Sequence, residues 1–191
     1  EIRLSLVGSE MCIRDSLGET ATIRRVSLMD QVRTYPSLLK SRRFWGYVGC
    51  ASFTSGSFFA YLGGAPYVGN VVFGLSSSEV GLLFAITAVG YLVGNFIAGR
   101  YSVRLGMNRM ILWGTIASIS GLGMLTLVTL AGVHSPYVFF GFTLALGFGN
   151  GMTLPNANAG MLSIKPELAG TASGLGGAIQ IGGGAALAAL A

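Results

Sequence analysis

The residues VGLLFAITAVGYLVGNFIA (80–98) are followed directly by GRYSVRLGMNR (99–109). The first stretch carries no charge, and a helix that rises about 1.5 Å per residue makes it long enough to cross the hydrocarbon core of a bilayer. The second stretch places Arg100, Arg104 and Arg109 in a short hydrophilic loop before the next apolar run. Because Lys and Arg in short loops stay cytoplasmic, the two stretches predict a transmembrane helix that ends at the cytoplasmic face.

The composition of the whole chain also indicates a membrane protein. The 191 residues are 52% hydrophobic and only 10% charged, whereas soluble domains are about a quarter charged. The net charge of +5 comes from basic residues beside apolar runs, so we interpret it as a topological signal and expect no nucleic acid as a partner. Cys12 and Cys50 lie too far apart for a metal or redox motif, and no metal or cofactor is expected.

Apolar runs along the chain predict an all-α integral membrane fold. The expected transmembrane helices are residues 44–68, 80–98, 110–131, 137–164 and 169–191. Gly63, Gly64 and Pro66 should break the first helix near its end, and Pro155 should break the fourth. The third helix has almost no polar residue in its interior, so we expect it to face lipid.

The segments before the first helix are interpreted differently. Residues 1–16 resemble a translated sequencing adapter and are left out of the fold, and residues 17–43 are expected to form a cytoplasmic linker. Residues 44–191 then form a transmembrane half-bundle. An odd number of helices that ends in an apolar run predicts a truncated chain.

The distribution of basic residues predicts the orientation. All 12 Lys and Arg residues lie before residue 44, in 99–109 or at Lys165, and the turns 73–79 and 132–136 hold none. This asymmetry predicts that the amino-terminal side is cytoplasmic. His134 lies in one of the turns without basic residues, where solvation is a simpler expectation than catalysis.

Residues four apart share one face of a helix, and the helix at 80–98 carries a polar stripe beside a stripe of small residues. The two stripes are Thr87, Tyr91 and Asn95, and Gly90, Gly94 and Ala98. The small stripe favours close approach of another helix, and Gly147 and Gly151 form a similar pair in the fourth helix. The polar stripe has two open interpretations: it lines a cavity, or it forms hydrogen bonds to a neighbouring helix.

Polar residues on other helices extend the candidate cavity. Asn150 is costly in hydrocarbon unless it has a partner, and Gln180 lies on one face with Ser173 in the Gly-rich last helix. Aromatic faces suit flat apolar ligands, and amides can orient them. The candidate substrate-binding residues are Tyr61, Thr87, Tyr91, Asn95, Asn150 and Gln180.

The hydrophilic stretch resembles the second-half copy of the cytoplasmic loop motif of the major facilitator superfamily. The matching residues are Gly99, Arg100, Arg104, Gly106 and Arg109, whereas Val103 stands where the full motif has Asp. The order of RRFWGY (42–47), SFFAYLGGAPYV (57–68), GLSSSEVGLLFA (74–85), LPNANAGML (154–162) and AGTASGLGGAIQIGGGA (169–185) resembles the carboxy-terminal half of drug-resistance transporters of the bicyclomycin and chloramphenicol efflux type.

This resemblance implies a secondary transporter of the bacterial inner membrane with two six-helix halves that rock around a central site. It implies export of drug-like small molecules by proton antiport, with the proton-carrying carboxylate in the first half. The implied partners are the substrate, protons and membrane lipids, and the full-length protein is expected to be monomeric. By itself this chain should not transport.

Two other functions stay open from the sequence. A transporter of this kind could export a native metabolite or sugar, or the chain could be a non-transporting subunit of a membrane assembly. An intramembrane serine protease is rejected, because Gly170, Ser173 and Gly174 have the wrong spacing and His134 lies in a loop.

Overall fold

The structure, a computed structural model, describes residues 28–190, and every regular element in this range is a helix. The interpretation of residues 1–16, and that of 17–27 as linker, lies outside the described residues. Thr34–Ala191 form one compact unit, to which the following description applies. The helices are α2 (Leu28–Leu39), α3 (Arg42–Tyr67), the π-helical turn η1 (Val68–Val72), α4 (Ser77–Leu105), α5 (Met107–Leu130), α6 (Pro136–Ser163), the 3-10 turn η2 (Pro166–Leu168) and α7 (Ala169–Ala189).

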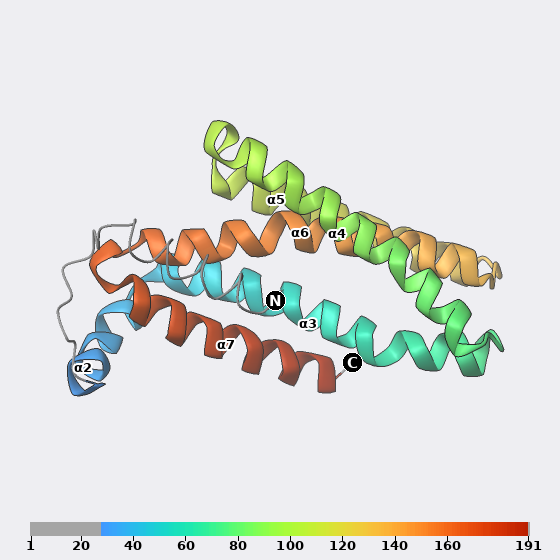
Figure 1. Cartoon of the computed structure of the whole chain (residues 1–191), viewed down its shortest axis with the longest axis horizontal. Coiled ribbons are helices and arrows are strands. Elements are labelled where there is room, and N and C mark those ends of the chain that lie inside the picture. Colours follow the sequence, from blue (N-terminus) through green and yellow to red (C-terminus); the bar gives the residue numbers. More distant parts are fainter. Residues whose placement is uncertain (1–27, 191) are drawn as a thin grey trace, which may run out of the picture. The chain divides into compact units, whose positions relative to one another are not determined.

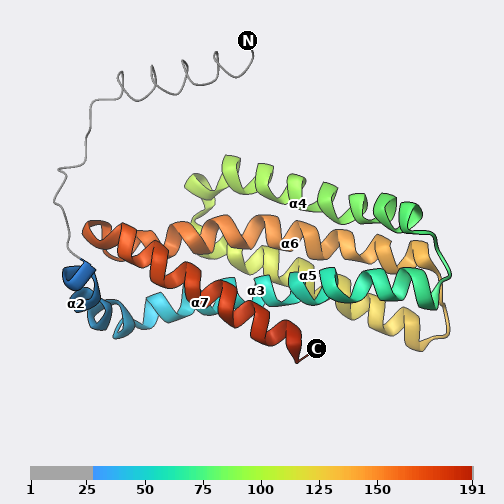
Figure 2. The same cartoon turned by 60° about the horizontal axis from the view of Figure 1, so that its bottom comes forward.

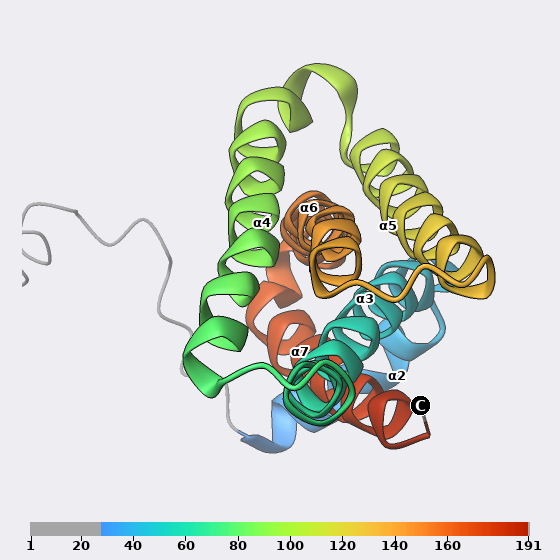
Figure 3. The same ribbon diagram turned by 90° about the vertical axis from the view of Figure 1, so that its right-hand side faces the viewer.

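The long helices α3 to α7 run side by side as a bundle with α6 in its interior (Figures 1 and 2). In the end-on view of Figure 3, α4 and α5 lie on opposite sides of α6, and α3 and α7 lie together beyond it. α6 contacts each of the other four long helices. This central position explains why α6 carries the largest share of buried residues, including polar ones.

Three helices, α4, α5 and α6, are long and apolar enough to cross a bilayer, among the residues that the structure describes. The helices α3 and α7 occupy the other two predicted spans, but their Gly and Ser content leaves them outside this set. An all-α membrane chain is therefore supported. The number of five spans stays a prediction.

The predicted loop at 99–109 is wrong, because nearly all of these residues are helical. Helix α4 continues through Leu105 and α5 begins at Met107, so Gly106, with a φ of 88°, is the only residue between them. Arginine is a good helix former, and its long side chain can reach water from a helix end, so the charged stretch does not interrupt the helix. The turn itself needs glycine at a positive φ.

The predicted proline breaks are also wrong. Pro66 lies inside α3, and the helix passes through Tyr67 directly into η1, where Phe73 N donates to Val68 O at 3.0 Å. Pro155 lies inside α6, which stays one helix over its whole length. A proline removes a single backbone donor, and a packed membrane helix tolerates this when neighbouring groups compensate.

The chain turns instead between η1 and α4, where Gly74 has a φ of 67°. Ser76 then caps α4: its Oγ accepts from Glu79 N at 3.3 Å, and Ser76 N donates to Glu79 Oε2 at 2.8 Å. This reciprocal arrangement satisfies two backbone donors at the helix start. It explains why α4 begins before the apolar run at Val80.

The predicted close approach through small residues is confirmed between α4 and α6. A Cβ on Gly90 or Gly94 would collide with backbone atoms of α6, and one on Gly147 or Gly151 would collide with backbone atoms of α4. The two glycine pairs therefore face each other. Such contact brings the helix backbones together and maximises van der Waals packing.

Glycines also lie at two further interfaces of the bundle, between α5 and α6 and between α3 and α7. A Cβ on Gly114 of α5 would lie 2.8 Å from Gly149 O of α6, and a Cβ on Gly56 of α3 would lie 3.3 Å from Gly184 O of α7. The outer face of α5 is left exposed, with Leu112, Ile116 and other large apolar side chains on it.

Candidate functional site

Three hydroxyl groups from three helices meet inside the bundle. Thr87 Oγ1 of α4 donates to Tyr61 Oη of α3 at 2.9 Å and lies 2.7 Å from Thr143 Oγ1 of α6. Thr143 Oγ1 also donates to Phe140 O at 2.7 Å. All three hydroxyl-bearing residues are buried, and Thr87 is only 3% exposed. We refer to Tyr61, Thr87 and Thr143 as the hydroxyl junction.

A groove between α3 and α4 opens beside the hydroxyl junction. Its volume is about 320 Å³, within the usual range of small-molecule sites. The lining is mainly aromatic and aliphatic, with three hydroxyl-bearing residues among its members: Phe58, Tyr61, Leu62, Gly81, Phe84, Ala85, Thr87, Ala88 and Tyr91. The rings of Tyr61 and Phe84 are tilted with centroids 5.0 Å apart. This lining can hold a flat apolar molecule and bind one polar group on it.

The predicted polar stripe of α4 divides between two environments. Thr87 and Tyr91 line the groove, and Tyr91 is 39% exposed there. Asn95 does not line it, because its Nδ2 donates to Tyr91 O at 2.9 Å on the same helix. Both interpretations of the stripe therefore apply, cavity lining for Tyr91 and interhelical bonding for Thr87.

Asn150 is the most unusual polar residue of the bundle. It is 1% exposed, and neither Oδ1 nor Nδ2 has a hydrogen-bond partner among the described residues. Helical spacing places it on one face of α6 with Leu146 and Ala157, which belong to the two apolar clusters that α6 shares with α3. Buried amides without partners are rare and costly, so this position needs an explanation beyond packing.

Gln180 lies apart from the hydroxyl junction. Its Nε2 donates to Ser55 Oγ at 3.0 Å and so connects α7 to α3. The same residue lines a small cavity of about 180 Å³ between α6 and α7, together with Asn158 and Ser173. The structure thus brings Tyr61, Thr87 and Tyr91 into one groove, whereas Asn95, Asn150 and Gln180 do not line it.

Sequence reasoning did not select Thr143, Phe58 or Phe84 for the site. Phe58 and Tyr61 are three residues apart in α3, which is a recognisable signal for a shared face. The sequence alone does not single out Thr143, because its role depends on the contact between α6 and α4. The exposed His134 takes no part in the groove.

The residues of the predicted loop motif lie at one end of the bundle. Gly99 and Gly106 line a groove of about 520 Å³ with Asn156 of α6. Arg100, Arg104 and Arg109 are exposed, and Val103, at the position of the motif's Asp, is 93% exposed. Without that carboxylate, the motif here forms no ion pair within the described residues.

We define the basic end of the bundle by the residues that gather where α3 and α7 begin and where α4 and α6 end (Figure 2). Every Lys and Arg between residues 34 and 190 lies there: Lys40, Arg42, Arg43, Arg100, Arg104, Arg109 and Lys165. Glu79 caps α4 at the opposite end, and Glu167 is the other acidic residue in this range.

Comparison with known proteins gives consistent matches. A family model described as Major Facilitator Superfamily matches residues 14–189. The "Uncharacterized MFS-type transporter YdgK" of Bacillus subtilis is 28% identical over 81% of this chain and 38% of the relative. The "Bicyclomycin resistance protein homolog" of Haemophilus influenzae is 27% identical over 83% and 39%, and the "Multidrug transporter MdfA" of Edwardsiella piscicida is 33% identical over 76% and 35%.

The chain therefore spans less than two fifths of the length of these curated relatives, at 35–39%. No solved structure matches the chain.

Proposed function

The chain belongs to the Major Facilitator Superfamily, and from this we propose that it forms part of a secondary transporter that exports drug-like small molecules in exchange for protons. It is a multi-pass membrane protein and not an enzyme, because the family consists of transporters. The observation that carries the proposal is the groove beside the hydroxyl junction, with its aromatic lining and few polar groups.

The substrate class follows from the chemistry of this lining. A sugar or a highly polar metabolite needs many hydrogen-bonding groups, and the groove offers chiefly the hydroxyls of Tyr61, Thr87 and Tyr91 among aromatic and aliphatic side chains. A flat apolar compound with one or two polar groups fits it better. The names of two relatives, a multidrug transporter and a bicyclomycin resistance protein homolog, support the same class.

Proton coupling is proposed for the complete transporter, of which this chain supplies one part. Between residues 34 and 190 the acidic residues are Glu79 and Glu167, which lie at the ends of the bundle and do not line the groove, and the Glu79 carboxylate is bonded to Ser76 in the cap of α4. A proton-carrying group normally lies inside the membrane. We therefore place the coupling carboxylate outside this range and expect that vesicles containing only this chain show no proton-driven drug efflux.

The decisive test is drug binding by the purified chain. We expect chloramphenicol to bind in the groove, and Tyr91→Ala to weaken binding about tenfold through loss of an aromatic wall. Tyr101→Ala is the matched control, because Tyr101 lies on the same helix with the same exposure of 39% but does not line the groove. Equilibrium dialysis with radiolabelled chloramphenicol measures both. Equal losses in the two variants would contradict the groove as the site.

A second test addresses the membrane topology. We propose five spans with the basic end in the cytoplasm, because basic residues in short loops are retained there. In a Cys12→Ser, Cys50→Ser background, a membrane-impermeant maleimide should label His134→Cys in intact cells. It should label Arg104→Cys only after the membrane is permeabilised. Labelling of both positions in intact cells would contradict this orientation.

A further inference from the structure

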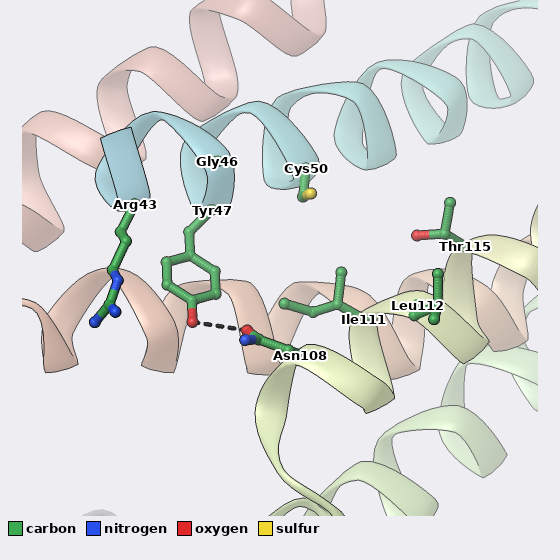
Figure 4. A pocket seen from close by; sticks show the side chains of 8 residues that line it. All are labelled: Arg43, Gly46, Tyr47, Cys50, Asn108, Ile111, Leu112 and Thr115. Atoms are coloured by element: carbon green, nitrogen blue, oxygen red, sulfur yellow. Dashed lines mark hydrogen bonds between the residues drawn. The ribbon is translucent and has the colours of Figure 1, made fainter. Parts of the chain in front are cut away.

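A second groove lies between α3 and α5 at the basic end, separate from the groove beside the hydroxyl junction. Its volume is about 650 Å³, and residues of both helices line it: Arg43, Gly46, Tyr47, Cys50, Asn108, Ile111, Leu112 and Thr115. Figure 4 shows the side chains of α3 above and those of α5 below, with Arg43, Tyr47 and Asn108 toward one end and Thr115 at the other. We refer to it as the α3–α5 groove.

The mouth of the α3–α5 groove is held in place by packing. The ring of Tyr47 fits against Gly160 of α6, where a Cβ would lie 2.5 Å from Cε1 of the ring. Tyr47 Oη donates to Asn108 Oδ1 at 2.8 Å, and Figure 4 shows this bond beside the side chain of Arg43. Because Oδ1 accepts this bond, the Nδ2 donors of Asn108 stay available at the mouth.

The charge at this mouth is not neutralised within the described part of the chain. Arg43 is exposed and forms no ion pair there. Lys40, Arg42 and Arg109 are further cations of the basic end. Of the two acidic residues between 34 and 190, Glu79 is committed to the cap at the far end of α4, and Glu167, just before α7, forms no ion pair with Arg43. The mouth therefore combines a guanidinium and an amide donor in a positive surrounding, and it favours an anion.

Beyond the mouth the lining is mainly apolar, with Thr115 as its polar residue. Ile111 and Leu112 of α5 form one wall, and the small residues Gly46 and Cys50 of α3 form the other. A Cβ on Gly46 would meet no atom within 4 Å. An open apolar channel of this kind accommodates a hydrocarbon chain that runs along the helices.

We infer that the α3–α5 groove binds one anionic phospholipid, with its phosphate at Arg43 and Asn108 and an acyl chain along Gly46 and Leu112. Guanidinium groups bind phosphate through two parallel hydrogen bonds, and basic pockets between membrane helices at the cytoplasmic side suit anionic headgroups. A free phosphate would use the mouth but not the apolar channel. The inference does not depend on drug binding or transport.

The test compares single-lipid binding by native mass spectrometry of the purified chain in detergent. The ligands are phosphatidylglycerol, phosphatidylcholine with the same acyl chains, and inorganic phosphate. We expect one phosphatidylglycerol to bind at least about fivefold more tightly than phosphatidylcholine. This is the gain in affinity that one Lys or Arg near the membrane surface gives toward an anionic lipid. Inorganic phosphate should not displace it at equimolar concentration.

Two variants test the headgroup and the acyl chain separately, each with a matched control. Arg43→Gln should weaken phosphatidylglycerol binding about fivefold, whereas Arg42→Gln, which removes a neighbouring cation that does not line the groove, should have less than about a twofold effect. Gly46→Leu should fill the channel and weaken binding of both lipids. Gly49→Leu should not, because Gly49 lies on the same helix with no atom within 4 Å of its Cβ but outside the groove.

Each contrary outcome overturns the inference. Equal losses in Arg42→Gln and Arg43→Gln would indicate diffuse attraction to the basic end. Unchanged lipid binding in Gly46→Leu would show that the acyl chain does not lie in the groove. Displacement of phosphatidylglycerol by inorganic phosphate would show that the mouth is a simple anion site. Circular dichroism of every variant checks that the helices are retained, and Gly49→Leu shows whether leucine in α3 is tolerated at all.

Discussion

Replacing Gly94 with alanine is expected to lower the free energy of unfolding by about 3 kcal/mol, because overpacking against an immovable neighbour costs about this much. The new Cβ would collide with Phe148 O of α6. It would also lie 3.1 Å from Gly151 Cα and Met152 N. These are backbone atoms of the central helix, so no side-chain rotation relieves the contact, and α4 must move away from α6.

The matched control for this prediction is Gly81→Ala on the same helix. A Cβ on Gly81 meets no atom within 4 Å, so the substitution should stabilise the helix slightly, by about 0.5–1 kcal/mol. Denaturation of the purified chain in detergent, followed by circular dichroism, measures both variants. Similar shifts of the unfolding midpoint for Gly81→Ala and Gly94→Ala would show that α4 and α6 are not in close contact.

Replacing Asn150 with leucine is expected to raise the free energy of unfolding by about 1–3 kcal/mol. The buried amide has no hydrogen-bond partner among the described residues, so the folded chain bears the cost of its desolvation. Leucine is apolar and not much larger than asparagine, so it can pack against the apolar side chains on this face of α6, such as Leu146. The same denaturation assay measures the effect.

Thr87→Val provides the opposite case and the control for Asn150→Leu. Thr87 Oγ1 has partners in Tyr61 and Thr143, so its loss should destabilise the bundle by about 1–3 kcal/mol. If Asn150→Leu were also destabilising, the amide would have a partner in the folded chain. If Asn150→Leu stabilises the bundle but weakens chloramphenicol binding, the Asn150 amide contributes to ligand binding and lowers the stability of the free protein.

How far the sequence predicts the candidate site depends on the range of the interaction. Helical spacing correctly placed Thr87 and Tyr91 on one face of α4, because that spacing is a local property of the backbone. It could not show that Tyr61 of α3 meets Thr87, that Gln180 bonds to Ser55, or that Asn150 stays without a partner. Each of these facts depends on which helices become neighbours.

Composition and residue spacing alone predict the all-α membrane character, the approximate positions of the long helices and the faces through which glycines allow close contact. Composition and periodicity suffice for these features, since each depends on one segment and its solvent. Two local predictions were wrong: Pro66 and Pro155 do not break their helices, and the three arginines of 99–109 do not form a loop. Local breakers are weak when long helices are stabilised by packing.

The pairing of polar groups and the positions of the grooves, in contrast, depend on how the helices pack against one another. The glycine contacts of α6 fix α4 and α5 on opposite sides of it, and this arrangement creates both the groove beside the hydroxyl junction and the α3–α5 groove. The physical reason is that a groove is a property of two helix surfaces and the angle between them. Neither helix carries that information in its own residues.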